Sequence, residues 1–421
     1  MGEFWIRAKP GPHAYLGLAG GDNTKEAAVA SHVYGQEIAA CEAFTSFGYA
    51  DGWRLDPRQL KPIGDRQFVK GMNEMVFHTY AHQHDDREPG MTLGQFGLNF
   101  TRKLTWWEQG RAWIKYITRC QHMLRQGLFV ADVCYFYGEN GPSSVHFYAN
   151  EHLQPRKVFQ PQTPQGYDFD CADRTILERM RVRDGRVVLP HGMSYPYLVV
   201  PHNAQMTLGA LEKIKELVLE GATVVGPPPV RTPSLTGYPE VETKREAIVS
   251  ELWPTQKGPQ GRQVGKGRVI HCESFATIFG HDGLAPDFEA VCPEQDADIR
   301  YIHRVQGDSD FYFVCNQQER TQNATLWFRV TGKVPEIWHP ETGKITRAPI
   351  YKIEGKRTAV AVEMKPHESF FVVFRDKANT QDSLVKLEKD GQATALQLVD
   401  PSAAKVPNSD AVVSALPSAV V

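Results

Sequence analysis

An alternation of strand-like and helix-like segments near the start of the chain constrains its fold most strongly. Apolar, β-branched or aromatic runs at residues 3–6, 38–45 and 74–80 have the composition of buried strands. The first two are separated by an Ala-rich segment, 25–35, that ends at Gly, and the last two by a segment with Pro57 after Asp56. Because strands joined through helices pair in parallel, this order predicts a parallel α/β sheet.

The pattern changes twice further along the chain. A helix is predicted from Trp106 to Gly127, and strands then alternate with helices again to about residue 275, although a Pro-rich segment, 227–259, interrupts them. Short apolar runs at even spacing follow, which is typical of a β-sandwich. We therefore expect domains at 1–127, 128–297 and 298–375, with a tail or a further truncated domain over 376–421.

Composition narrows the classes of partner. Lys and Arg number 47 against 49 Asp and Glu, so the net charge of -2 gives no basic excess that would attract nucleic acid or an anionic membrane. No apolar run is long enough to predict a membrane span. Seven cysteines without a C-x-x-C pair indicate buried thiols. A neutral substrate suits this balance, whereas the first residues lack the plan of a secretory signal and leave the localisation open.

Two glutamates are placed where catalytic carboxylates are expected. Cleavage of a glycosidic bond needs a proton donor and a second carboxylate on the other side of the sugar. Glu42 lies near the end of the second run, and Glu3 has a comparable position in the first. In parallel barrels the strand ends face the active site. The alternative is that each glutamate belongs to an ordinary ion pair or contacts a loop.

Histidines and aromatic residues follow these carboxylates. His78, Tyr80 and His82 alternate along the third run, which predicts that all three point to one face, as a pocket wall or as a polar face bonded to loops. His82 and His84 lack a third ligand of firm spacing and are weak evidence for zinc. Further along, Asn99, Trp106 and Trp107 form either a sugar subsite, with rings that stack on C–H faces, or part of a core. These side chains are the candidate substrate contacts.

Several motifs, in their order and spacing, resemble the second half of the catalytic barrel of α-L-rhamnosidases of glycoside hydrolase family 106. They are residues 3–5 (Glu-Phe-Trp), 30–35 (Ala-Ser-His-Val-Tyr-Gly), 41–46 (Cys-Glu-Ala-Phe-Thr-Ser), 71–78 (Gly-Met-Asn-Glu-Met-Val-Phe-His) and 99–107 (Asn-Phe-Thr-Arg-Lys-Leu-Thr-Trp-Trp). The resemblance continues through 119–133 and covers residues 1 to about 375.

The resemblance implies the last strands of a (β/α)₈ barrel, then a flavodoxin-like or amidotransferase-like α/β domain and a β-sandwich. It also implies inverting hydrolysis of terminal α-L-rhamnosyl residues, from plant or algal glycans or from glycosides, assisted by calcium. Glu42 is then a catalytic carboxylate, and Glu3 is the second carboxylate or a calcium ligand. The expected sugar-binding residues are His78, His82, Asn73, Tyr80, Asn99, Trp106 and Trp107.

The chain departs from this family in its length. A complete barrel has eight strands and about 250 residues, whereas only three strands are predicted before residue 105. We therefore expect an incomplete barrel, with the activity of this chain alone left open. Two other readings remain: a β-galactosidase-like or glucuronidase-like hydrolase with the same architecture, and a non-catalytic carbohydrate-binding fragment. Nothing in the sequence indicates the glycan, the linkage or the oligomeric state.

Overall fold

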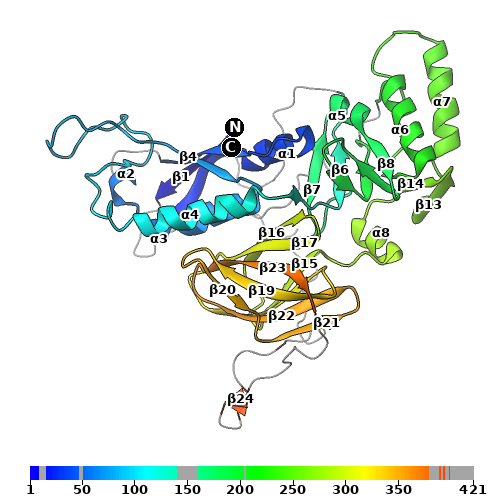
Figure 1. Ribbon diagram of the computed structural model, residues 1–421. Helices are drawn as coiled ribbons and strands as arrows, with labels where there is room; N and C mark the ends of the chain where they lie inside the picture. Colours follow the sequence, from blue (N-terminus) through cyan, green and yellow to red (C-terminus); the bar gives the residue numbers. More distant parts are fainter. Residues whose placement is uncertain are drawn as a thin grey trace, which may run out of the picture.

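Three regions built on several sheets follow one another along the chain (Figure 1). The computed structural model describes residues 1–8, 16–46, 51–139, 160–202 and 205–378, with short pieces between 388 and 398. It is a mixed α/β structure, as the sequence predicts. In the described residues no helix is both long and apolar enough to cross a membrane. All seven cysteines are free thiols and five of them are buried, which confirms the prediction of mostly buried thiols.

The first region is a four-stranded sheet with the order β2-β1-β3-β4. Its elements are β1 (Gly2–Ala8), β2 (Leu16–Asp22), α1 (Thr24–Tyr34), β3 (Ala40–Ser46), α2 (Asp51–Arg54), α3 (Pro57–Val69), β4 (Glu74–Phe77) and α4 (Arg111–Leu124). The predicted parallel pairing of β1, β3 and β4 is confirmed. Strand β2, antiparallel to β1, was not predicted, because its Gly-rich sequence lacks the composition of a strand.

Local sequence signals explain the helices of this region. Asp56 and Gln59 form a reciprocal capping box at the start of α3, with Pro57 at the first helical position. Gly35 ends α1 with a φ of 75°, a left-handed conformation that favours glycine. The start predicted for the third helix is wrong, because α4 begins at Arg111 after a series of turns and not at Trp106.

Among the residues that the structure describes, helices pack on one face of this first sheet. Phe4, Ile6, Cys41 and Ala43 point to the covered face and belong to one core with residues of α3 and α4. Alternate positions on the same strands, Glu3 and Glu42 among them, are partly exposed. The sheet therefore has a covered face and an open face.

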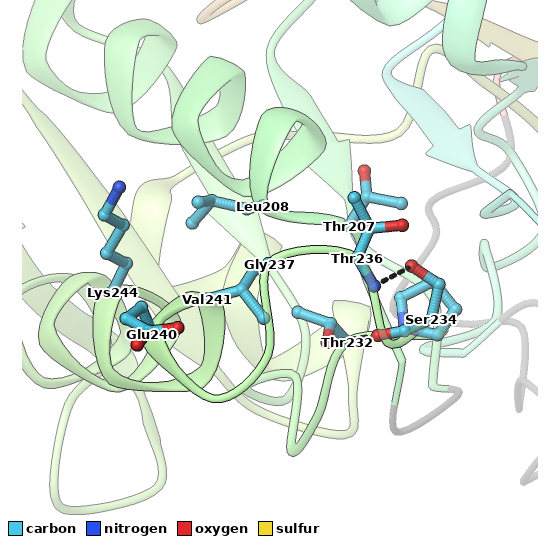
Figure 2. Close-up of a pocket in the computed structure, with 10 residues that line it drawn as sticks. Thr207, Leu208, Thr232, Ser234, Thr236, Gly237, Glu240, Val241 and Lys244 are labelled. Carbon is cyan, nitrogen blue, oxygen red and sulfur yellow. Dashed lines mark hydrogen bonds between the residues drawn. The ribbon is translucent and has the colours of Figure 1, made fainter.

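The central region is a six-stranded sheet with the order β13-β14-β12-β11-β6-β7, parallel apart from β13. Its elements, with a small antiparallel sheet of β8 to β10, are β6 (Val133–Phe136), β7 (Phe169–Ala172), α5 (Arg174–Arg179), β8 (Arg181–Arg183), β9 (Arg186–Val188), β10 (Ser194–Tyr195), β11 (Tyr197–Val199), α6 (Leu208–Glu220), β12 (Thr223–Val225), α7 (Glu240–Leu252), β13 (Gly258–Val264), β14 (Gly267–His271) and α8 (Phe275–Asp282). Helix α7 lies inside the segment where prolines predicted an interruption; Pro239 precedes the helix as its N-cap, and Pro254 follows it. A pocket of about 580 Å³ opens between α6 and α7 (Figure 2).

The third region consists of two antiparallel sheets with the orders β15-β18-β22-β21 and β20-β19-β23-β17-β16-β5. Their elements are β5 (Leu128–Phe129), β15 (Phe288–Val291), β16 (Ile299–Gln306), β17 (Ser309–Asn316), β18 (Gln322–Phe328), β19 (Lys333–His339), β20 (Lys344–Arg347), β21 (Tyr351–Glu354), β22 (Arg357–Met364) and β23 (Ser369–Lys377). Tyr312 and Phe374 of one sheet share a core with Leu326 and Phe328 of the other. A separate short hairpin pairs β24 (Glu388–Lys389) with β25 (Gln392–Ala393).

Buried polar contacts join the first region to the other two. Lys25 of α1 lies 2.8 Å from Asp168, and the His32 Nδ1 atom lies 3.0 Å from an Asp170 carboxylate oxygen of β7. Arg304 of β16 donates to the backbone carbonyl oxygens of Gln126 and Gly127, at 2.8 Å each. The contacts of Lys25 and His32 fix helix α1 against the central region, and those of Arg304 fix the segment after α4 against the third region.

Candidate functional site

Two carboxylates lie side by side on the open face of the first sheet. Glu3 of β1 and Glu42 of β3 are direct partners in the parallel pairing, and both are half-buried. Neighbouring strands are about 4.8 Å apart, and side chains at paired positions point to the same face. The structure thus brings together the two glutamates that the sequence singles out.

A β-bulge in β3 shapes the surroundings of Glu42. The register shifts so that Glu42 pairs with Glu3 while Thr45, three residues on, pairs with Trp5. Phe44 takes up the extra residue with a φ of 63°. The Thr45 hydroxyl consequently donates a 2.6 Å hydrogen bond to Glu42 Oε1.

Sequence reasoning missed Thr45, because residues at i and i+3 of a regular strand point to opposite faces. No local signal in Ala43-Phe44-Thr45 indicates a bulge. Trp5 was noticed only as part of a motif, yet its ring meets Phe96 edge to face, with centroids 5.9 Å apart. Trp5 alternates with the buried Phe4 and Ile6, so this aromatic pair lies on the same face as Glu3.

Packing on the opposite side of the sheet holds β3 and β4 in place. Phe44 packs against Trp113 of α4, with ring centroids 5.6 Å apart, and Gly64 of α3 leaves room for Phe44 and Met75. Burial raises the pKa of the Cys41 thiol to about 11. Although Cys41 adjoins Glu42 in sequence, it therefore stays protonated on the covered face and offers no thiolate nucleophile.

The prediction that His78, Tyr80 and His82 alternate along a strand is wrong. Strand β4 ends at Phe77, and the three residues follow it in irregular backbone, because the chain turns there to meet the segment at Gly97. The His78 carbonyl accepts from the Leu98 amide at 2.8 Å, and a Cβ on Gly97 would come within 2.7 Å of His78 Nδ1. His78 is half-buried at the carboxyl end of the sheet, whereas Tyr80 and His82 are exposed.

Asn73 lies at the other end of β4. Its side chain accepts from the Ala39 amide at 2.8 Å and donates to the carbonyl oxygens of Glu37 and Leu124. Only 2% of Asn73 is exposed. These bonds tie the loop before β3 to the end of α4, so the structure does not bring Asn73 to the glutamate pair.

The aromatic segment before α4 divides into buried and exposed residues. The Trp106 indole N–H donates to the Leu55 carbonyl at 3.0 Å, and its ring packs on Phe100 and Trp113. Trp106 is therefore partly buried, whereas Asn99 is buried and its backbone N–H donates to the Gly52 carbonyl. Trp107 is 40% exposed and is the member of this group that remains available for a ligand.

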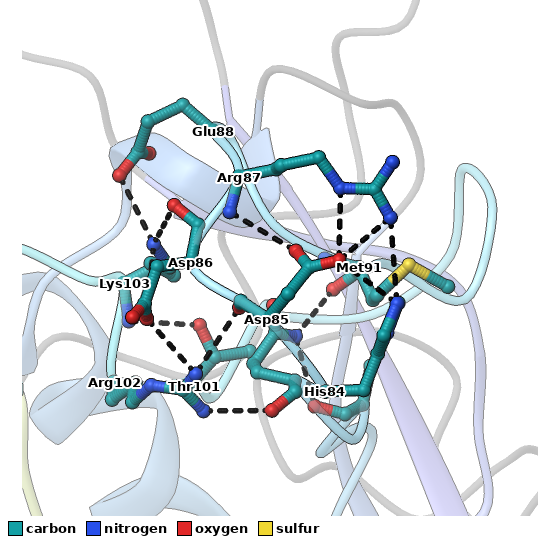
Figure 3. A network of polar contacts seen from close by, with 11 residues as sticks. His84, Asp85, Asp86, Arg87, Glu88, Met91, Thr101, Arg102 and Lys103 are labelled. Carbon is teal, nitrogen blue, oxygen red and sulfur yellow. Dashed lines mark hydrogen bonds and ion pairs between the residues drawn. The ribbon is translucent and has the colours of Figure 1, made fainter.

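A network of charged residues organises the loop that follows His82 (Figure 3). Arg102 donates to the Gln83 carbonyl at 2.9 Å and pairs with Asp86, while Lys103 pairs with Glu88. Hydrogen bonding from Arg87 lowers the pKa of Asp85, and hydrogen bonding from Arg102 lowers that of Asp86. The network therefore stays charged at neutral pH and pins the loop between Gln83 and Lys103.

The donors for a metal ion are few. Calcium takes six to eight oxygen ligands, and zinc takes four ligands rich in His and Cys. Among the residues that the structure describes, no group of three or more His, Cys, Asp or Glu side chains could hold a metal. Glu3 and Glu42 alone do not form a calcium site, and His84 contacts Asp85 at 2.9 Å instead of a second histidine.

Paired carboxylates on a parallel sheet, with aromatic side chains beside them, are the groups that glycoside hydrolases use. The alpha-L-rhamnosidase model of glycoside hydrolase family 106 matches residues 1–353. The chain therefore belongs to the α-L-rhamnosidase family of glycoside hydrolases, as its motifs suggest.

Two similar proteins show how much of a relative this chain spans. A rhamnosidase structure from Novosphingobium sp. PP1Y is 35% identical with a TM-score of 0.80, and the match covers 92% of this chain and 36% of that one. A Formosa agariphila protein described as "Putative beta-glucuronidase" is 33% identical over 392 residues, which are 93% of this chain and 30% of that protein. The chain thus spans about a third of the length of these relatives.

Proposed function

We propose that this chain supplies part of the active site of an enzyme that hydrolyses terminal α-L-rhamnosyl residues of plant or algal glycans or glycosides. The observation that carries the proposal is the register pairing of Glu3 with Glu42 on the open face of the first sheet. Two carboxylates on one face can flank a glycosidic bond. Membership of the rhamnosidase family favours rhamnose as the sugar.

The chemistry we propose is inverting hydrolysis. One carboxyl group protonates the leaving oxygen while the other removes a proton from the attacking water. Room for that water needs about 6.5 to 9.5 Å between the carboxyl groups, so the two side chains have to diverge from the roughly 4.8 Å spacing of their strands. Thr45 holds Oε1 of Glu42 at 2.6 Å, which fixes the carboxylate relative to the sheet and leaves its second oxygen for substrate or water. Around this pair we place His78, Tyr80, His82 and Trp107 in sugar binding.

The architecture supports a partial barrel. In the described part of the chain, three parallel strands, joined through α1 and α3, have helices packed on one face, and the carboxylates of Glu3 and Glu42 point to the other. In a closed (β/α)₈ barrel the uncovered face is the interior, and catalytic residues come from the strand ends. We infer that β1, β3 and β4 are the last part of such a barrel, with the activity a property of the longer polypeptides seen in the relatives.

Calcium stays a prediction from the family resemblance. Bound near Glu3, it would hold sugar hydroxyls, but the described residues supply too few ligands and no step depends on it. A second candidate is hydrolysis of a β-glucuronide, which the name of the Formosa protein favours. Carbohydrate binding without turnover is the alternative outside the hydrolases.

The test assays the complete gene product on aryl α-L-rhamnoside and aryl β-D-glucuronide, with and without a calcium chelator. We expect release from the rhamnoside with inversion at the anomeric carbon, detected by NMR of the first product. Release from the glucuronide alone would replace the proposal with its second candidate. Binding of rhamnosides without release would leave a carbohydrate-binding protein, and a rate that the chelator does not change would remove calcium.

A further inference from the structure

The pocket between α6 and α7 lies where open α/β sheets bind ligands. Its walls come from the first turn of α6, the start of α7 and the segment 232–237 (Figure 2). The parallel strands follow one another along the chain as β6, β7, β11, β12 and β14. Across the sheet they lie in the order β7, β6, β11, β12, β14, so the first two are exchanged. Ligands of such sheets sit outside the carboxyl ends of the strands, near the point where this order reverses. Helix α6 begins in the connection that leaves β11, one of the two strands at that point.

One wall of the pocket is held firmly. Arg245 of α7 pairs with Glu242 at 2.6 Å and donates to the Pro229 carbonyl at 3.0 Å. Glu242 in turn accepts from the Thr232 amide at 2.8 Å and from its hydroxyl at 2.5 Å. These bonds from Thr232, with the ion pair to Arg245, hold the pKa of Glu242 at about 2. Bonds within the protein therefore fix the segment that borders the pocket to α7, and its position does not depend on a ligand.

The lining combines hydroxyl groups, two opposite charges and apolar patches. Ser234 and Thr236 supply hydroxyls, and Leu208 with Val241 supplies the apolar part. Glu240 and Lys244 also line it, and within the described part of the chain neither has an ion-pair partner. Tyr238, 62% exposed, adjoins the lining residues. A ligand with many hydroxyls and flat C–H faces matches this lining, because the hydroxyls and charged groups can bind its oxygens and the apolar side chains can contact its C–H faces.

A phosphate ligand fits poorly here. The anion position at the start of α6 is filled by the protein itself, because the Glu139 carboxylate accepts from the Thr207 amide at 2.8 Å and from its hydroxyl at 2.7 Å. Arg174 balances Glu139 at 2.7 Å. A helix N-terminus that already holds a carboxylate repels a second anion.

We propose that this pocket is a second saccharide-binding site, separate from the glutamate pair, that takes a hydroxyl-rich segment of a glycan. It lies on the central region, whereas Glu3 and Glu42 lie on the first sheet. The site would hold a polymeric substrate while the glutamate pair acts on another part of it. The pocket binds a saccharide whether or not the chain is a rhamnosidase.

The experiment titrates a short rhamnogalacturonan oligosaccharide into the full chain by calorimetry. Thr236→Trp fills the pocket, and Thr243→Trp adds the same ring to an exposed position of α7 outside the lining. We expect Thr236→Trp and Lys244→Ala each to weaken binding by about tenfold or more, a loss of about 1.4 kcal/mol, while Thr243→Trp binds as the parent does. Circular dichroism melting checks that each variant folds.

Each other outcome overturns the proposal. Oligosaccharide binding that Thr236→Trp and Lys244→Ala leave unchanged would place the ligand elsewhere, and binding of inorganic phosphate or of flavin mononucleotide that Thr236→Trp removes would make it an anion site. All titrations are repeated with the Glu42→Gln variant. Binding at the pocket is then measured independently of the glutamate pair, so a result that contradicts one proposal leaves the other untouched.

Discussion

The molecule contains two sheets built mainly of parallel strands, and they differ in how far their two faces are covered. In the central sheet, every residue of β6, β7 and β11 is buried. In the first sheet, β1 alternates between buried and half-exposed residues, Glu42 of β3 is half-exposed, and Val76 of β4 is 41% exposed. Parallel sheets are ordinarily covered on both faces, so the central sheet follows the rule and the first does not.

The difference in coverage changes what a carboxylate on each sheet can bind. Asp170 of β7 is fully buried and is bonded to His32 at 3.0 Å and to Tyr195 at 3.0 Å. Glu42 of β3 is half-buried, and its Oε1 atom accepts a 2.6 Å hydrogen bond from the Thr45 hydroxyl. The oxygens of a buried carboxylate have to be hydrogen-bonded within the protein, whereas a carboxylate on an open face has an oxygen available for a ligand. The open face thus suits chemistry, and the covered faces suit stability.

Neutralising the two carboxylates separates these roles and gives the largest effects. Glu42→Gln should lower kcat/KM of the complete enzyme by about 10²- to 10⁴-fold, the usual contribution of a general acid or base, with unfolding unchanged. Asp170→Asn should instead destabilise the fold while Glu42 still acts. Aryl rhamnoside kinetics and urea unfolding measure both. Activity retained in Glu42→Gln would show that Glu42 is not a catalytic carboxylate and would contradict the contrast between the two sheets.

A matched pair of valines measures how covered each sheet is. Val199 of β11 is 1% exposed and Val76 of β4 is 41% exposed. Val199→Ala removes two buried methyl groups and leaves a cavity, so we expect a loss of about 2 kcal/mol in the free energy of unfolding. Val76→Ala should cost less than about 0.5 kcal/mol. Equal losses in urea unfolding would show that the face at Val76 is covered in solution.

Acid should weaken the contact between the two sheets. Burial outweighs the opposing influence of Asp170 and lowers the pKa of His32 below 6.5. The unfolded chain therefore binds the proton more readily, and the stability is present above pH 6.5 and lost as the pH falls below that value. His32→Gln should be less stable at neutral pH and show a flatter dependence on pH. An identical slope in the variant, from urea unfolding between about pH 7.5 and 5.5, would contradict this assignment.

The loop beside the open face should show the smallest effect. Arg87, whose side chain is 79% exposed, pairs with Asp85 at 2.6 Å. Since exposed ion pairs contribute little, Arg87→Ala should change the free energy of unfolding by less than about 0.5 kcal/mol. Lys103, whose side chain is 11% exposed, is the matched inner position of the network, and Lys103→Ala should cost more. Thermal melting of both variants ranks them; the reverse order would mean that the outer pair fixes the loop.

Much of the architecture could be predicted from local sequence. The capping box at Asp56, the glycine at 35 and the apolar runs place the helices and strands, and strands connected by helices have to pair in parallel. Family motifs such as Cys41 to Ser46 also identified the family. These features are readable because each depends on neighbours a few residues away.

Other features were decided only by tertiary structure. The bulge at Phe44 turns Thr45 toward Glu42, and it exists because β1 pairs with β3 in a shifted register. The end of β4 at Phe77, which takes His78 off the strand, depends on contact with Gly97. Such outcomes depend on which distant segments meet. The sequence thus determined that two glutamates would stand at strand positions of a parallel sheet, and the packing decided that they share a face that no helix of the described residues covers.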